Sequence, residues 1–180
     1  MTQTFVFLAL GFGLLSWFDE AELRWIGAAG LILLGVFALL RVHHANRRRV
    51  ARRTVEGLRG ILPGEFEAEV GRWLRRDGWD VEHRGGTGDR GIDIFARRRR
   101  QTLAVQCKRY AESAAVSASQ VRDLYGAALA EGATGAVLVT TGRVSGPALE
   151  WAAALPAGVP IAFHDQNCLA SVAAGQARVA

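Results

Sequence analysis

Two short apolar segments, and the arginine run between them, constrain the fold of this chain most. Residues 92–96 read IDIFA, residues 102–110 read TLAVQCKRY, and RRRRQ separates them at residues 97–101. Both segments have the length and the side-chain alternation of β-strands, and a polar connection this short joins antiparallel neighbours. The sequence therefore predicts a β-hairpin, and the hairpin determines which side chains stand next to each other.

The polar residues of this hairpin are expected to converge at its open end. Asp93 alternates with apolar neighbours, while Gln106 and Lys108 lie two residues apart and so share one face of their strand. Glu67 lies one position off the apolar stripe of the preceding helix and is expected to aim inward and join them. Two carboxylates, an amide oxygen and an ammonium at one edge suit a hard cation such as Mg²⁺, with Mn²⁺ as a substitute. Such a cation would serve phosphoryl chemistry.

Lys108 is the only lysine in the chain, because all the other basic residues among the 22 Lys and Arg are arginines. A lysine ammonium is compact and has a tunable pKa, whereas a guanidinium is delocalised and permanently charged. The retention of a single ammonium at this position favours a chemical role in which arginine performs poorly.

Several classes of site are excluded by composition and context. Cys107 and Cys168 form no CxxC pair and, with four scattered histidines, indicate neither a disulfide scaffold nor a structural zinc site. Cys107 is expected to be a small core side chain. Gly86, Gly88 and Gly91 spell GxGxxG, but they run into a strand instead of opening a helix, so a dinucleotide site is not predicted.

The remaining segments of the C-terminal part alternate between helix and strand. Residues 65–78 form an amphipathic helix with Phe66, Val70, Trp73 and Leu74 on its apolar stripe and Glu69 among the residues that face water. After the strand at 79–83 and the hairpin, the order is helix from Ser117 or Ser119, strand 136–141, helix 145–155, strand 159–165 and a short final helix. This order predicts an α/β fold with a mixed β-sheet flanked by helices.

The N-terminal region is expected to be a transmembrane helical hairpin. No charge occurs in residues 1–18 or 25–40, and a short polar loop joins the two runs. Helices over about 4–18 and 25–40 are somewhat shorter than a span usually needs, and flanking Trp and Phe side chains would sit at the interface. A secretory signal peptide, which lacks its positive n-region here, and two buried helices of a soluble domain are the alternatives.

A cluster of arginines follows the second apolar run. Residues 41–60 hold seven Arg against one Glu, a net charge of +6, whereas residues 61–180 hold 14 basic and 13 acidic groups. Such a cluster keeps its side of a span in the cytoplasm, so both termini are expected to face the cytoplasm from a bacterial inner membrane. The segment 43–60 is therefore interpreted as a juxtamembrane linker whose arginines also meet lipid head groups.

The spacing of Glu67, GGTGDRGIDI and QCK resembles the Mrr-type restriction endonuclease domain, a branch of the PD-(D/E)xK nuclease superfamily. The likeness continues through VRDLYGAA and GAVLVTTG and covers about residues 61–175, followed by a tail at 176–180. The resemblance implies a restriction-endonuclease-like fold for this domain. It also implies that Asp93, Gln106 and Glu67 bind the metal and that Lys108 is catalytic with them. Glutamine at 106 is this branch's variant of an acidic position.

Four further residues are candidates for DNA contact or for supporting the site: Gly88, Asp89, Arg109 and Gln120. A turn-forming role for Asp89 and a helix-end hydrogen bond for Gln120 are the structural alternatives. The arginine run at 97–100 is interpreted as a solvated turn, with DNA phosphates as the alternative contact.

The resulting functional hypothesis is a membrane-anchored, Mg²⁺-dependent DNA endonuclease that restricts foreign or modified DNA. Its partners would be DNA, membrane lipid through the N-terminal hairpin and, for double-strand cutting, a second copy in a homodimer. Two alternatives remain open: a catalytically inactive DNA-binding or membrane-tethering module, and a repair nuclease that resembles Holliday-junction resolvases.

Overall fold

The computed structural model describes residues 32–43, 54–84, 91–156 and 158–180. The chain divides into two compact units, Met1–Arg48 and Arg49–Ala180. In the first unit, residues 32–43 form a helix whose side chains are exposed. No helix within the described ranges combines the length and the apolar character needed to cross a membrane. The expected span at 4–18 and the start of the one at 25–40 lie outside the described residues.

The second unit is built on a five-stranded mixed sheet, as the sequence predicts. The strand order is β1-β2-β3-β5-β7. The first three strands pair antiparallel, and β3, β5 and β7 run parallel to one another. Two-residue strands β4 and β6 form a small separate sheet. The bounds are β1 Asp80–His83, β2 Ile94–Arg98, β3 Gln101–Lys108, β4 Ala115–Val116, β5 Gly135–Thr140, β6 Arg143–Val144 and β7 Ile161–His164.

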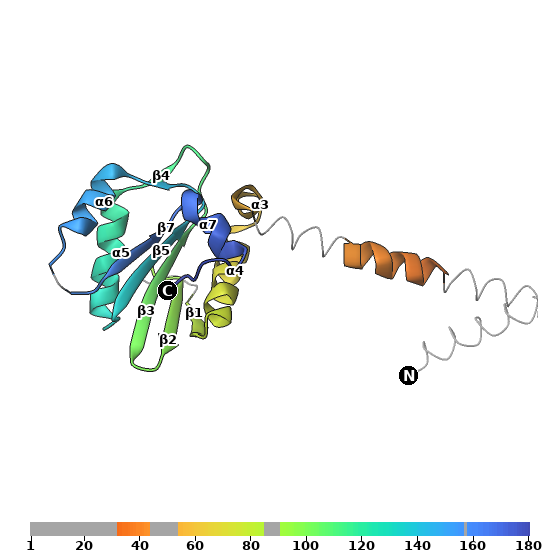
Figure 1. The fold of residues 1–180 in the computed structure, drawn as a ribbon, viewed down its shortest axis with the longest axis horizontal. Helices are drawn as coiled ribbons and strands as arrows, with labels where there is room; N and C mark the ends of the chain where they lie inside the picture. Colours follow the sequence, from red (N-terminus) through yellow and green to blue (C-terminus); the bar gives the residue numbers. More distant parts are fainter. Residues whose placement is uncertain (1–31, 44–53, 85–90, 157) are drawn as a thin grey trace, which may run out of the picture. The chain divides into compact units, whose positions relative to one another are not determined.

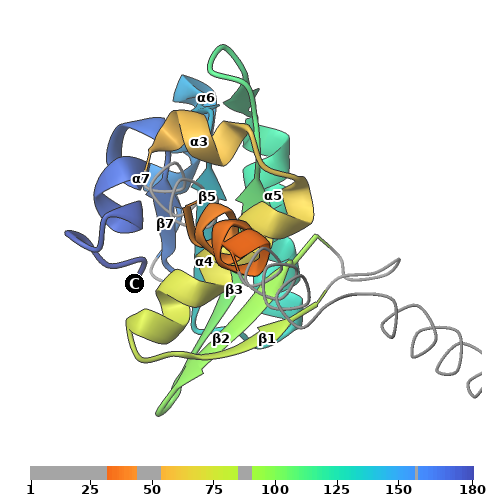
Figure 2. The same cartoon turned by 90° about the vertical axis from the view of Figure 1, so that its right-hand side faces the viewer.

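Helices cover both faces of the sheet (Figures 1 and 2). One core joins α3, α4 and α7 to side chains such as Val105 and Cys107, and the other joins α5 and α6 to side chains such as Ala104. Successive residues of β3 thus enter opposite cores, as the period of a strand requires. The helix bounds are α3 Val55–Arg59, α4 Pro63–Arg76, α5 Ala118–Ala130, α6 Gly146–Ala153 and α7 Gln166–Ala173.

Helix α4 differs from its prediction at two points. It begins at Pro63 rather than at residue 65, because proline is well suited to the first helical position, where its missing N–H costs nothing. Glu69, expected to face water, is only 6% exposed. Its carboxylate forms an ion pair with Arg72, which lies one turn further along the helix and is exposed. The pairing lets a charged residue occupy the margin of the buried face.

The compact unit is longer at both ends than the domain expected at 61–175. Leu58 of α3 is fully buried in the core that α4 and α7 share, although the sequence analysis assigns it to the linker. At the other end Val179 is 2% exposed, and its N–H donates to Asp77 Oδ2 at 2.9 Å. The carbonyl of Val179 lies 2.7 Å from His164 Nε2. The segments around Leu58 and Val179 therefore belong to the folded domain.

Leu58→Ala tests whether α3 is part of the domain. Removing a fully buried leucine side chain costs about 2–5 kcal/mol of unfolding free energy, so we expect a large drop in the urea midpoint. Leu62→Ala is the matched control, because Leu62 is 71% exposed and should change stability by less than about 0.5 kcal/mol. Equal effects of the two substitutions would contradict the placement of α3.

Candidate active site

Strand β2 leaves its partner β3 at Asp93. The pair Ile94↔Val105 is the last in the register, and continuing it by two residues would pair Ile92 with Cys107. The N–H of Cys107 instead donates to Asp93 Oδ2 at 2.6 Å. A side-chain carboxylate thus takes the place of a backbone carbonyl, and the backbone of Asp93 is held by a bond of 3.0 Å from its N–H to Val105 O. The Asp93 carboxylate is therefore fixed at the edge of β3, between Gln106 and Lys108.

Gln106 is 5% exposed and has one well-defined partner. Its Nε2 donates to the carbonyl of Gly91 at 2.6 Å. Exchanging the amide nitrogen and oxygen would set two acceptors against each other, so the orientation follows from this contact. Gln106 Oε1 is buried, and no donor among the described residues reaches it. A buried oxygen without a donor costs about 1–3 kcal/mol, a cost that a bound cation would remove.

Gly91 gives Gln106 this position. Its φ is +79°, in the left-handed region, and a Cβ placed on it would lie 2.9 Å from Gln106 Nε2. Only glycine meets both conditions without strain. The local backbone conformation therefore explains why residue 91, the last of the glycine-rich segment before β2, is a glycine.

Lys108 ends β3 on the same face as Gln106. Its carbonyl accepts from Thr140 Oγ1 at 2.8 Å and from the N–H of Thr141 at 3.2 Å, which ties the end of β3 to the end of β5. The side chain is partly exposed. No hydrogen bond or ion pair of its ammonium is found within the described ranges.

The thiol of Cys107 shows that charged groups from separate elements converge here. Burial raises the pKa of this thiol well above its ordinary value, and the negative charges of Asp93 and Glu67 raise it further. The Lys108 ammonium acts in the opposite direction. Glu67 from α4 is therefore close enough to the hairpin to act on the same atom as Asp93 and Lys108. The raised pKa also supports the expectation that Cys107 is a core side chain, because a nucleophile needs the thiolate.

The supporting candidates have other partners or fall outside the described residues. Gln120 caps α5: its Oε1 accepts from the N–H of Ser117 at 3.0 Å, and its Nε2 donates to the Tyr110 hydroxyl at 2.7 Å. Arg109 is exposed, and its Nη1 donates to the carbonyl of Arg59 at 2.7 Å. Gly88 and Asp89 lie outside the described residues. The helix-end alternative thus accounts for the contacts of Gln120.

Arg59 is a residue of this region that the sequence analysis did not single out. Its Nε donates to Thr141 O at 3.1 Å and its Nη2 to Gln166 Oε1 at 2.7 Å. Nη1 pairs with Glu56 at 3.1 Å and with Glu112 at 3.5 Å. The guanidinium thus connects α3 to the ends of β5 and β7. Arg59 is one of the seven arginines in the cluster at residues 41–60, and no sequence signal distinguishes it from the other six.

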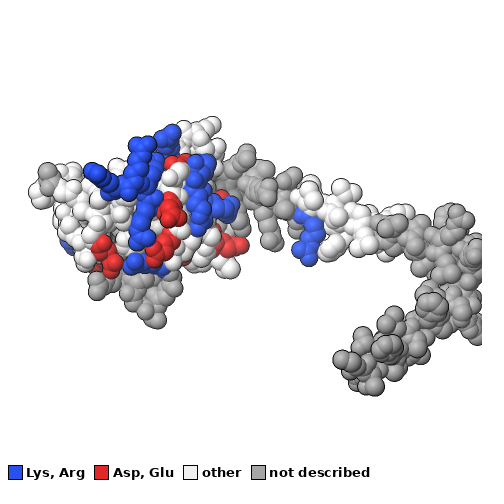
Figure 3. Space-filling model, turned by 90° about the horizontal axis from the view of Figure 1, so that it is seen from below, with Lys and Arg blue, Asp and Glu red and all other residues white. Residues whose placement is uncertain are grey.

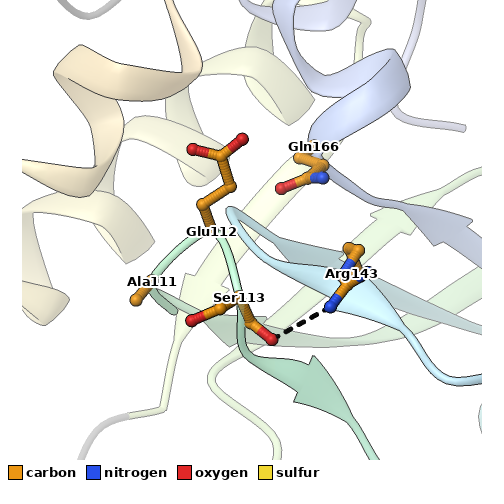
Figure 4. Close-up of a pocket in the computed structure, with 5 residues that line it drawn as sticks. All are labelled: Ala111, Glu112, Ser113, Arg143 and Gln166. Carbon is orange, nitrogen blue, oxygen red and sulfur yellow. Dashed lines mark hydrogen bonds between the residues drawn. The ribbon is translucent and has the colours of Figure 1, made fainter.

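Glu112 and Gln166, two partners of Arg59, line a hollow of about 590 Å³ (Figure 4). It is lined by residues that follow the carboxyl ends of parallel strands, the usual place for ligands in open α/β sheets. Arg143 Nη2 crosses it to Ser113 O at 3.2 Å. The complete lining is Ala111, Glu112, Ser113, Arg143 and Gln166.

The donor set at Asp93 fits an oxygen-preferring cation. No three His, Cys, Asp or Glu side chains gather into a metal cluster in the part of the chain that the structure describes. The set here instead has two acids and one amide, and the amide oxygen of Gln106 is buried without a donor among the described residues. Carboxylate and amide oxygens are ligands of Mg²⁺ and Mn²⁺. The residues present therefore suit such an ion.

Comparison with known proteins identifies related sequences and folds. The family model Mrr_cat, described as restriction endonuclease, matches residues 44–172. The uncharacterized protein y4cE of Sinorhizobium fredii (strain NBRC 101917 / NGR234) is 37% identical over an alignment of 94 residues, and the match covers 45% of this chain and 24% of that protein. The match thus spans about a quarter of the length of that curated relative.

Two solved structures superpose on parts of this chain. The DNA modification-dependent restriction endonuclease AspBHI superposes with a TM-score of 0.54 at 20% identity, over 74% of this chain and 37% of that one. The MspJI restriction endonuclease in complex with a 27-mer oligonucleotide gives a TM-score of 0.41 at 19% identity, over 59% and 26% of the two chains. The first likeness confirms the restriction-endonuclease-like mixed sheet expected from the sequence.

Gly91→Ala tests the backbone geometry that positions Gln106. The new Cβ meets Gln106 Nε2 at 2.9 Å in a left-handed conformation, so we expect a loss of about 1–3 kcal/mol in unfolding free energy. Gly126→Ala is the control, because no atom lies within 4 Å of a Cβ placed on this helical residue. Alanine at 126 should raise the free energy of unfolding by about 0.5–1 kcal/mol. Urea denaturation of both variants measures the difference. A neutral Gly91→Ala would rule out the described approach of residue 91 to Gln106.

Proposed function

The chain belongs to the Mrr_cat family of restriction endonucleases, which are DNA nucleases, and we propose that it hydrolyses DNA phosphodiester bonds with a divalent cation bound by Asp93, Gln106 and Glu67. The observation that supports this most is the buried Oε1 of Gln106, which lacks a donor among the described residues and lies next to the position where Cys107 fixes the Asp93 carboxylate. Two further proposals are the restriction of foreign or modified DNA and a homodimer that cuts both strands.

The cation is proposed to be Mg²⁺, with Mn²⁺ as a substitute, and when bound it polarises a phosphoryl oxygen and activates a water for in-line attack. Glutamine at 106 carries no charge, so the site has one negative charge fewer than an all-carboxylate site. This lower charge favours a single ion. The Asp93 carboxylate is oriented by the Cys107 N–H, which donates to it at 2.6 Å.

Lys108 is proposed to stabilise the charge that develops on the scissile phosphate. Its backbone is fixed between Thr140 and Thr141, so its ammonium projects from a rigid strand end. The lining of the hollow begins at Ala111, three residues after Lys108 and about 10 Å along the chain. We propose that the exposed Arg109 and Arg143 contact phosphates that flank the cleavage point.

The membrane tether belongs to the same proposal. The apolar runs and the arginine cluster of residues 41–60 support an anchor in a bacterial inner membrane, with the nuclease domain on the cytoplasmic side. Large hydrophobic side chains on the helix at 32–43 are exposed, which also suits contact with lipid or with another apolar surface.

Lys108→Ala tests the catalytic assignment. In a plasmid nicking assay with Mg²⁺, we expect a loss of roughly 10²–10³-fold, because one charge-stabilising donor is removed. Lys108→Arg should recover little of this activity, since a guanidinium differs in size and donor geometry. Arg122→Ala is the control, because Arg122 is exposed on α5 and has no role in the proposed site. Chelation of the metal should abolish cleavage by the unmodified protein, and undiminished cleavage by Lys108→Ala would disprove its role.

Flotation with lipid vesicles tests the tether. We expect the full chain to float with vesicles and residues 49–180, the compact unit, to remain in the soluble fraction. High salt should not release the full chain, because an apolar anchor does not depend on the charge of the arginine cluster. Recovery of the full chain in the soluble fraction would contradict the proposed anchor.

A further inference from the structure

A second basic region lies at the end of the sheet opposite to Asp93 and Lys108. It surrounds the turn between β2 and β3, which is at the lower end of the domain in Figure 1 and faces the viewer in Figure 3. The eight residues of β3 separate this turn from Lys108, a distance of about 25 Å. The arginine end is defined here as Arg97, Arg98, Arg99 and Arg100.

The carboxylates near the arginine end are engaged within the protein. Glu82 accepts from Arg97 Nη1 at 2.9 Å and from Arg84 Nε at 3.3 Å, and these hydrogen bonds lower the pKa of Glu82. Arg84 also pairs with Glu131 at 3.1 Å. Arg99 and Arg100 are exposed, and within the described ranges neither forms an ion pair. Their two charges therefore project into solvent without local compensation.

With the neighbouring end of α4 and start of β1 included, six arginines stand against four carboxylates near the turn, a net charge of +2. Figure 3 shows arginine side chains around a few acidic ones on this side of the domain. The residues counted are Arg75, Arg76, Arg97, Arg98, Arg99 and Arg100 with Asp77, Asp80, Glu82 and Glu131.

The backbone of the turn is strained by its sequence. Arg99 has a φ of +55° and is the one non-glycine residue in the described ranges with positive φ. Two-residue hairpin turns favour Gly, Asn or Asp, which adopt this conformation at lower cost. The fold alone would be served better by glycine, so the arginine at this position points to a use of its side chain.

Aromatic rings hold the neighbouring guanidinium groups in place. Arg98 lies 4.2 Å from the Trp79 ring centroid and donates to Asp77 O at 3.1 Å. Arg84 lies 4.3 Å from the centroid of Phe95. Such stacking leaves the planar guanidinium fork largely pre-organised for an anion, and arginine is the preferred side chain for phosphate.

We propose that the arginine end is an auxiliary DNA-binding site, which contacts backbone phosphates about 25 Å from the cleavage point. DNA is favoured over a lipid surface because family membership already makes DNA the polyanion that this domain meets. The contacts involve phosphates and not base edges, so they raise affinity without selecting a sequence.

Binding of a fluorescent 30-base-pair duplex in EDTA, followed by anisotropy, tests the proposal in the full chain without any cleavage. For Arg99→Gln/Arg100→Gln we expect at least a 10-fold loss of affinity at low salt. The slope of log K against log[salt] should fall by about 2, because about one counterion is released per phosphate contact. Arg99→Gln alone should lower the slope by about 1. Arg122→Gln, which removes the same charge from α5, should leave affinity and slope unchanged.

Arg99→Gly separates binding from folding. Glycine relieves the positive φ, so the melting temperature should be unchanged or higher while DNA affinity falls as it does for Arg99→Gln. Equal DNA affinity of Arg99→Gln/Arg100→Gln and Arg122→Gln would overturn the proposal. Because no metal is present, the result stands apart from whether Asp93 and Lys108 cleave DNA.

Discussion

The site depends on one irregular hydrogen bond between β2 and β3. Here the Asp93 carboxylate, and not a backbone carbonyl, accepts the hydrogen bond from the N–H of Cys107. That bond ends the pairing of β2 with β3 and, at the same step, sets a charged group at the edge of the strand that bears Gln106 and Lys108. Beyond this point Gly91 lies close to Gln106, and its carbonyl accepts a hydrogen bond from the amide nitrogen of Gln106. The hydrogen bond that ends the pairing of β2 with β3 therefore also positions the first charged group of the site.

The arrangement of the sheet explains why these groups gather at one end of the molecule. Strand β3 is central, antiparallel to β2 and parallel to β5. Its end meets the start of β2 on one side and the ends of β5 and β7 on the other, so loops from four strands meet near Lys108. At the other end of β3, a tight turn connects it to β2, and the side chains of this turn are exposed arginines. The two ends of this strand therefore carry different chemistry.

Periodicity in the sequence was sufficient for most of the fold, because the alternation of β3 and the apolar stripe of α4 are local patterns. It also predicted that Gln106 and Lys108 share a face, which follows from their spacing alone. The convergence of Asp93 and Glu67 on Cys107 agrees with the expected order of elements. These parts require no knowledge of distant contacts.

Other parts could not be predicted, because they depend on pairings between residues far apart in the sequence. The burial of Leu58 and the partners of Arg59 require α7 and the end of β5 to be in place. The Oε1 of Gln106 is identified as an isolated acceptor only once Gly91 O has fixed the nitrogen. The expected spans before residue 32, with Gly88 and Asp89, lie outside the described residues.

Arg59 also has a mechanical consequence. Its guanidinium bonds to Thr141 O, and the N–H of Thr141 bonds to the carbonyl of Lys108. The guanidinium is thus two hydrogen bonds away from the Lys108 carbonyl. It also bonds to Gln166 and forms an ion pair with Glu112. Helix α3 therefore cannot detach from the domain without breaking contacts to three separate segments, one of which is bonded to the strand end that bears Lys108.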